Sequence, residues 1–152
     1  MLKKSIEVKN AELWSPENPA LYTVTVSLDT KSKITSDEKT VRFGFRDIVM
    51  NQDGFFLNGK KYKIRGLDRH QSYAYCGYAV PESVQRFDAE GLKNELCLNA
   101  VRTSHYPQSQ HFIDACDELG LLVFTEIPGW QHIGKSAEWR NQAVQNTKDM
   151  VL

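Results

Sequence analysis

The chain has 152 residues, enough for one ordinary domain but too few for two large ones. Lysine plus arginine and aspartate plus glutamate each number 19, so the net charge is zero, which excludes nucleic-acid or anionic-membrane binding driven by bulk charge. The three cysteines form no C-x-x-C pair, which favours a reducing compartment. The start does not resemble a signal peptide, and the longest apolar run (120–124) is too short to span a bilayer. We therefore expect a cytoplasmic protein with no membrane partner.

Residues 1–50 have the pattern of β-strands. Polar and apolar side chains alternate over 21–28, which is typical of a strand with one buried face. A polar, charged stretch at 29–40 is expected to connect it to a long strand over 41–50, in which Gly44 marks a candidate bulge. A sandwich of the immunoglobulin type needs about seven strands, so this part predicts only some strands of such a domain.

From residue 51 onward, strands and helices alternate. Asn58-Gly59 between apolar runs predicts a β-hairpin. Further along, the patterns predict strands at 62–66, 99–102 and 121–127, and helices at 81–96, 109–119 and 136–152. This alternation predicts a parallel sheet with right-handed crossovers, either a small open sheet or the start of a barrel. We therefore expect an α/β domain over 51–152, after a boundary at residue 50.

Each of the three predicted strands of this α/β part runs into side chains capable of recognition. These are Asp68, Arg69 and His70 after the first strand, Arg102, Ser104, His105 and Tyr106 after the second, and Glu126, Trp130 and His132 after the third. Because the carboxyl ends of parallel strands meet at one edge, where chemistry is usually found, the three groups predict the wall of a pocket.

Simpler interpretations of the same residues remain open. Arg102 and Glu126 are candidates for a purely structural ion pair between neighbouring strands, and Trp130 for a cap on the core. His70 and His105 are equally consistent with ordinary loop histidines. Cys97 and Cys116 are expected to be small core residues.

Metal and nucleotide sites are less well supported. Four histidines with Asp68 and Glu126 could supply zinc ligands, but no H-x-H or H-E-x-x-H pair is present and the spacing is diffuse. The sequence contains neither a phosphate-binding glycine loop nor a serine nucleophile elbow. We expect no metal and no cofactor. A zinc-dependent hydrolase remains the weakest of three hypotheses.

The segment "NAVRTSHYPQSQHFIDACDELGLLVF" (99–124) combines Asn99, Arg102, the "TSHYP" core, Asp117 and Gly120 at fixed spacing. In this it resembles the signature segment of glycoside hydrolase family 2, which includes β-galactosidases, β-glucuronidases and β-mannosidases. The stretch "FFLNGKKYKIRGLDRHQ" (55–71) resembles the entry into that family's catalytic barrel. "LWSPENPALYTVTVSL" and "VRFGFRDI" resemble the end of the immunoglobulin-like domain before it.

The resemblance implies a partial TIM barrel of about three βα units, preceded by the last strands of an immunoglobulin-like β-sandwich. It implies a retaining β-glycosidase, whose two catalytic carboxylates lie about 5–5.5 Å apart. Both glutamates are expected beyond Leu152, and Glu126 is neither of them. This chain is then a fragment that supplies substrate-binding wall, is inactive alone and has the rest of a parent chain as its partner.

By the same resemblance, His70 and His105 hydrogen-bond sugar hydroxyls, and Arg102 orients a catalytic carboxylate and keeps it ionised. Asp68 stands where many relatives have asparagine. We expect Asp68 and Trp130 to contact substrate as well, with Arg69, Tyr106 and Glu126 as further pocket candidates. The segment "TEIPGWQHIG" does not reproduce the magnesium-binding pattern of some large β-galactosidases, so we predict no magnesium there.

The leading hypothesis is therefore a β-galactosidase fragment that acts on terminal β-D-galactosides, because "DRHQ" fits that branch better than a glucuronidase. A β-glucuronidase or β-mannosidase parent is an alternative within the family. The runner-up outside it is a non-enzymatic carbohydrate-binding module. Since three of eight barrel strands leave an open sheet edge, we also expect self-association of the isolated chain.

Overall fold

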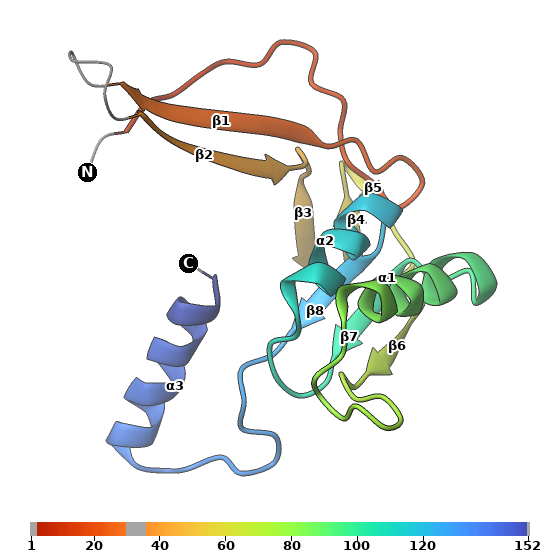
Figure 1. Cartoon of the computed structure of the whole chain (residues 1–152), viewed down its shortest axis with the longest axis vertical. Coiled ribbons are helices and arrows are strands. Elements are labelled where there is room, and N and C mark those ends of the chain that lie inside the picture. The colour runs from red at the N-terminus through yellow and green to blue at the C-terminus, as the bar shows by residue number, and fades with distance from the viewer. Residues whose placement is uncertain (1–2, 30–35, 152) are drawn as a thin grey trace. The chain divides into compact units, whose positions relative to one another are not determined.

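The computed structural model describes residues 3–29 and 36–151. By their contacts the residues divide into two compact units, Met1–Lys63 and Ile64–Leu152, which are described separately. Figure 1 shows the chain from its N-terminal strands to its C-terminal helix. The division by contacts falls further along the chain than the boundary that the sequence predicts at residue 50.

The first unit begins with an antiparallel pair, β1 (Tyr22–Asp29) and β2 (Ser36–Phe43). The alternating stretch 21–28 therefore forms the predicted strand. The prediction of one long strand over 41–50 is wrong, because β2 ends at Phe43, and β2 begins inside the polar stretch that we expected to be a connection. The part of that stretch at 30–35 lies outside the described residues.

The strand is interrupted at Gly44 because the backbone there passes close to a buried tryptophan. Trp14 is 1% exposed, and its backbone N–H donates to the carbonyl of Phe45 at 2.7 Å. A Cβ at Gly44 would lie 2.7 Å from the Cβ of Trp14, closer than atoms pack. The glycine therefore permits a close approach instead of a bulge within a continuous strand.

The apolar face of β1 is exposed, contrary to the half-buried strand that its alternation predicts. Val24 is 40% exposed, Val26 64% and Leu28 66%, and Val41 on β2 is 48% exposed. Val24 pairs with Val41 in register, so the apolar side chains form a continuous strip. Among the described residues nothing buries this strip.

A three-stranded antiparallel sheet completes the first unit. It contains β3 (Ile48–Asn51), β4 (Gly54–Leu57) and β5 (Lys60–Lys61). The predicted hairpin at Asn58-Gly59 is confirmed, with φ of 52° and 76° at these two residues, as a type I′ turn requires. The Asn58 side chain also donates to the carbonyl of Trp14 at 3.0 Å, which ties the turn to the buried ring.

The second unit contains the predicted parallel sheet, formed by β6 (Gly66–Arg69), β7 (Ala100–Thr103) and β8 (Leu122–Thr125). The first of these strands starts where the predicted strand 62–66 ends. The Asn99 side chain accepts from the Arg65 N–H at 2.7 Å, and a Cβ at Gly66 would lie 2.7 Å from the Ala100 carbonyl oxygen. The close pairing with β7 therefore begins at Gly66, a constraint that strand propensity does not report.

Two helices pack side by side in this unit (Figure 1). Helix α1 (Glu82–Glu90) continues into the π-helical turn η1 (Gly91–Glu95), and α2 (Gln110–Leu119) ends at Gly120 with φ of 79°. The core of the unit consists of Ala89, Val101, Phe112, Ala115, Cys116 and Leu121. Burial raises the pKa of the Cys116 thiol to about 12, as expected for a core cysteine. Cys97 is exposed, so its predicted core position is wrong.

Helix α3 (Ala137–Val151) forms where predicted but buries none of its side chains. On α1 the buried residues are Gln85 and Ala89, whereas the apolar Phe87 is 60% exposed. The helices thus form where the sequence pattern predicts them, and on α1 a polar glutamine is buried while an apolar phenylalanine is exposed. Within the described residues, no helix is both long enough and apolar enough to cross a membrane.

The contact at Gly66 gives a test of the sheet. We expect Gly66→Ala to lower the free energy of unfolding by about 1–3 kcal/mol, because the new methyl group overlaps backbone. Gly91→Ala is the matched control: Gly91 has a helical φ of −61° and open space around it, so alanine there should stabilise by about 0.5–1 kcal/mol. Urea unfolding of both variants measures the difference, and equal effects would contradict the pairing described.

Candidate functional site

Arg102 stands at the centre of a charged cluster at the carboxyl ends of the parallel strands. Arg102 on β7 pairs in register with Asp68 on β6, and Glu126 directly follows β8. The guanidinium donates from Nε to Glu126 Oε1 at 2.5 Å and from Nη1 to Asp68 Oδ2 at 3.1 Å. One cation thus joins carboxylates from both neighbouring strands, and the predicted Arg102–Glu126 ion pair is present.

Glu126 is held in its ionised form. The hydrogen bond from Arg102 lowers the pKa of the Glu126 carboxyl, and contact with His105 lowers it further against the opposing effect of burial. The pKa of Arg102 is raised in turn, first by its bond to Glu126. Both partners are about one-third exposed or more, so the pair remains accessible to a polar ligand.

His105 connects this cluster to a row of rings. Its Nδ1 lies 3.1 Å from Glu126 Oε2 and 3.4 Å from Arg102 Nη2. With the proton on Nδ1, the imidazole donates to the carboxylate, and Nε2 is the nitrogen that can accept a hydrogen bond. The ring stacks on Trp130 at 5.2 Å between centroids and meets His70 edge-on at 5.4 Å. The peptide bond between Ser104 and His105 is cis.

Tyr106 extends the row on the far side of His70. Its ring lies 6.3 Å from His70 and meets Tyr78 edge-on at 5.8 Å. The Tyr106 hydroxyl accepts from the Gln71 backbone N–H at 3.0 Å. Burial, and next Tyr78, raise the pKa of Tyr106 above its ordinary value.

A cavity of about 590 Å³ opens beside Arg102, His105, Glu126 and Trp130. The rest of its wall is Ile127, Pro128, Gly129, Gln131, Ile133 and Trp139. Gly134 lies so close to the ring of Trp139 that a Cβ there would come within 2.5 Å of it. The glycine therefore permits the segment after β8 to pack on Trp139, a residue that the sequence pattern did not single out.

Arg69 does not belong to this cluster, and its prediction as a pocket residue is wrong. Neighbouring side chains on a strand point to opposite faces, so Asp68 and Arg69 diverge. Arg69 is 7% exposed and donates to Asp88 at 2.6 Å and to Gln85 at 2.9 Å, both on α1. Its guanidinium also lies 3.9 Å from the ring centroid of Phe112 on α2.

The remaining strand-end residues are not part of the accessible cluster. Ser104 is fully buried, and among the described residues its hydroxyl has no hydrogen-bond partner. His132 is exposed and is not among the residues that line the cavity. The structure therefore brings together Asp68, His70, Arg102, His105, Tyr106, Glu126 and Trp130.

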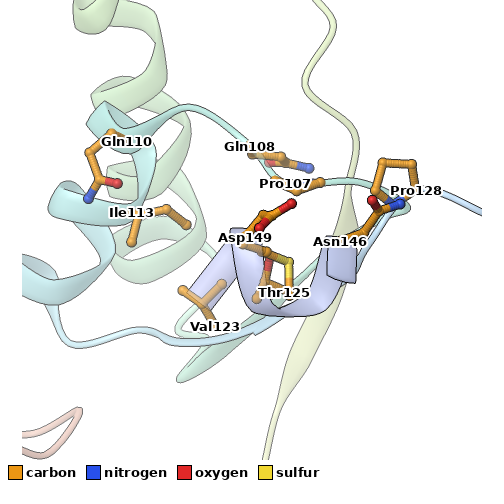
Figure 2. Close-up of a pocket in the computed structure, with 10 residues that line it drawn as sticks. Pro107, Gln108, Gln110, Ile113, Val123, Thr125, Pro128, Asn146 and Asp149 are labelled. Atoms are coloured by element: carbon orange, nitrogen blue, oxygen red, sulfur yellow. The ribbon is translucent and has the colours of Figure 1, made fainter. Parts of the chain in front are cut away.

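A second cavity, of about 670 Å³, lies between α2, β8 and α3. Figure 2 shows Gln110 and Ile113 of α2 at one end and Pro128 and Asn146 at the other. It contains none of the residues predicted for recognition. Over the described residues, no three histidine, cysteine, aspartate or glutamate side chains converge as a metal site would require.

Two family models match the chain in succession. Residues 1–46 match the model described as glycosyl hydrolases family 2, and residues 48–150 match the TIM barrel domain of glycosyl hydrolases family 2. The chain belongs to glycosyl hydrolase family 2. The parallel βα units thus belong to a family 2 TIM barrel domain, and β3, β4 and β5 lie within the same match. Strands β1 and β2 belong to the sandwich domain that precedes it.

Individual relatives agree with the family models. The chain is 59% identical to a β-galactosidase of Thermoanaerobacterium thermosulfurigenes over 144 residues, 95% of this chain and 20% of that protein. It is 51% identical to a β-galactosidase of Thermoanaerobacter pseudethanolicus, with 98% and 20% covered. A crystal structure of Parabacteroides merdae β-glucuronidase matches with a TM-score of 0.86 and 34% identity, covering 99% of this chain and 19% of that one. The chain thus spans about a fifth of the length of these relatives.

The pKa of Glu126 gives a pH-dependent prediction. That pKa is lowered in the folded chain. The ionised carboxylate therefore stabilises the fold at pH values above the ordinary glutamate pKa of 4.5, and this stabilisation is lost as the pH falls through the lowered pKa. We expect Glu126→Gln to lower the midpoint of thermal unfolding at pH 7, with a difference from wild type that shrinks below pH 4.5. The control is Glu138→Gln in the exposed first turn of α3. A deficit independent of pH would contradict the ion pair.

Proposed function

We propose that these residues are part of the substrate-binding wall of a retaining β-galactosidase that hydrolyses terminal β-D-galactosides. The observation that carries the proposal is the cluster of Arg102, Glu126, His105, His70 and Trp130 at the carboxyl ends of three parallel strands. Barrel enzymes place their chemistry at this edge. The 59% identity to a β-galactosidase supports the choice of sugar.

Each side chain has a role that fits a sugar ligand. His70 and His105 present ring nitrogens that can bond sugar hydroxyls, and such bonds accelerate hydrolysis if they strengthen as the ring flattens towards the oxocarbenium ion. The exposed face of Trp130 offers a surface on which the apolar face of a pyranose can stack. Arg102 and Asp68 fix the polar floor beside them.

Glu126 is poorly suited to either catalytic carboxylate role. A general acid needs a raised pKa, whereas the pKa of Glu126 is lowered. A nucleophile needs a free oxygen, whereas both oxygens of Glu126 are engaged, by Arg102 and His105. We therefore propose that both catalytic carboxylates come from residues outside this chain, and that the chain alone hydrolyses no galactoside.

The charge of the site favours a neutral sugar over a glucuronide. A glucuronate carboxylate needs a cation, and the guanidinium of Arg102 already faces two carboxylates, Asp68 and Glu126. A third carboxylate at this point would meet net negative charge. The structural similarity to a β-glucuronidase keeps glucuronate as the competing ligand in the test below.

Ligand titration tests the proposal on the chain itself. We expect galactose to change the Trp130 fluorescence saturably, with glucuronate binding more weakly, and Trp130→Phe identifies the signal. His105→Ala should weaken galactose binding about tenfold, the loss of one hydrogen bond to a ligand. His132→Ala, which removes an exposed histidine outside the cluster, should leave it unchanged.

Two outcomes would count against the proposal. No saturable change up to high millimolar galactose would remove the binding wall. Hydrolysis of a nitrophenyl β-galactoside that disappears in His105→Ala would show that the chain carries its own catalytic carboxylates.

We also propose that the isolated chain self-associates through the apolar strip of β1 and β2. Val24, Val26 and Leu28 lie on one face and are 40–66% exposed, and exposed apolar patches promote association. We expect light scattering at high concentration to give a mass above that of a monomer. Val26→Lys should lower it, whereas Ser27→Lys, which adds the same charge on the opposite face, should not. A monomeric wild type would contradict this proposal.

A further inference from the structure

Two chain segments carry the two histidines of the site. His70 lies in the segment that leaves β6, and His105 lies in the segment that leaves β7. The residues on both sides of His70 hydrogen-bond to the segment that contains His105. We call this set of hydrogen bonds the clasp; it is formed by Arg69 and Gln71 on one segment and by Ser104, Tyr106, Gln108 and Ser109 on the other.

On the Arg69 side the clasp has three hydrogen bonds. The Arg69 carbonyl accepts from the Ser104 N–H at 3.1 Å and from Gln108 Nε2 at 2.6 Å. Arg69 Nη1 donates back to Gln108 Oε1 at 2.6 Å. The amide of Gln108 is therefore fully oriented, with its oxygen and its nitrogen both bound to the same residue.

On the Gln71 side the clasp has two. The Gln71 N–H donates to the Tyr106 hydroxyl at 3.0 Å, and the Gln71 side-chain oxygen accepts from the Ser109 N–H at 2.5 Å. Ser109 precedes the first residue of α2, so this contact also fixes the start of that helix. His70 is thus one residue between two tied neighbours, with little backbone freedom of its own.

The clasp rests on a rigid base. The Arg69 guanidinium, 7% exposed, is bound by Asp88 and Gln85 of α1 and lies over Phe112 of α2. A buried ion pair with these additional bonds has one good geometry, and moving it would leave a charge unpaired. The two segments that carry the histidines are therefore hydrogen-bonded to a buried ion pair of the core.

We propose that Gln71 is a positioning residue that sets the approach of His70 to His105. In this role Gln71 acts through its hydrogen bonds to Tyr106 and Ser109, which hold the segment of His70 against the segment of His105. The Arg69 contacts fix one side of His70. Without the Gln71 side-chain bond, the hydrogen bond to Tyr106 is what remains on the other side among the described residues. The link to sugar binding rests on the proposed function, whereas the claim about the ring geometry does not.

Positioning of this kind affects binding strongly because the two rings act as a pair. Hydrogen-bonding groups recognise a ligand well only when packing and neighbouring bonds hold them within about 0.5 Å of the productive geometry. With centroids 5.4 Å apart and planes at 74°, His70 and His105 present their nitrogens in fixed relative directions. A looser His70 would lose this relation without losing the residue.

Three variants isolate the Gln71 oxygen. Gln71→Ala removes the acceptor of the Ser109 N–H, whereas Gln71→Glu keeps an acceptor oxygen, replaces the amide nitrogen by a second oxygen and adds one negative charge. Gln142→Ala is the control, since Gln142 is an exposed glutamine on α3 that bonds within its own helix. The buried Arg69 is left intact, so the base of the clasp is preserved in every variant.

The first readout is independent of any sugar. Histidine-ring NMR of the 152-residue chain, with His111 and His132 substituted for assignment, should show a cross-peak between the ring protons of His70 and His105. We expect Gln71→Ala to lose this cross-peak while the chain stays folded, and Gln71→Glu and Gln142→Ala to keep it. A cross-peak that persists in Gln71→Ala, or that is equally lost in Gln71→Glu, would overturn the positioning role.

The second readout is galactose affinity. We expect Gln71→Ala to weaken binding about fivefold to tenfold, with recovery in Gln71→Glu, which corresponds to the loss of about one hydrogen bond. If the cross-peak follows the prediction but wild type binds no galactose, the clasp stands and the proposed function falls. If galactose binds equally well to wild type and Gln71→Ala, the positioning role falls and the proposed function stands.

Discussion

The buried guanidinium of Arg69 is the interaction on which the rest of the barrel portion depends. A charge that is 7% exposed is tolerated only where it is paired and hydrogen-bonded, and here Asp88 and Gln85 of α1 and Gln108 of the loop before α2 satisfy it. These bonds join β6, α1 and the start of α2 at one point. The positions of the strand ends that carry the candidate site therefore depend on the Arg69–Asp88 ion pair, which lies on the opposite face of β6.

The pleat of β6 explains how one short strand serves two purposes. Asp68 and Arg69 are adjacent, yet Asp68 bonds Arg102 within the site while Arg69 packs against the helices. A slip of one residue would exchange them, which would bury an unpaired carboxylate and expose the cation. The close approach at Gly66 resists such a slip, because only glycine fits against the Ala100 carbonyl. Site and core are thus specified by the same register.

Much of this could be read from the sequence, where the determinants are local. The Asn58-Gly59 turn, the three helices and the parallel order of the strands follow from turn chemistry and periodicity. Turn chemistry and periodicity did not predict three other features: the start of β6, the interruption of the strand at Gly44 and the burial of Arg69. Each depends on a distant partner, Ala100, Trp14 or Asp88, that periodicity cannot reveal. Gln71 and Gln108 escaped notice because nothing marks a loop glutamine until its partners are in place.

The electrostatics of the site then bear on the chemistry that the proposed function requires. Glycoside hydrolysis needs one carboxyl group that holds a proton near neutral pH and a second that stays ionised. Arg102 and His105 both bind Glu126 in a way that favours its ionised form, so Glu126 is not suited to give a proton to a leaving group. What this wall does present is a row of rings beside a cation that already contacts two carboxylates. In the proposed function, such a surface would discriminate between sugars by the positions of their hydroxyl groups and by their apolar faces. For that reason the fixed geometry of His70 and His105 matters more here than the net charge of the pocket.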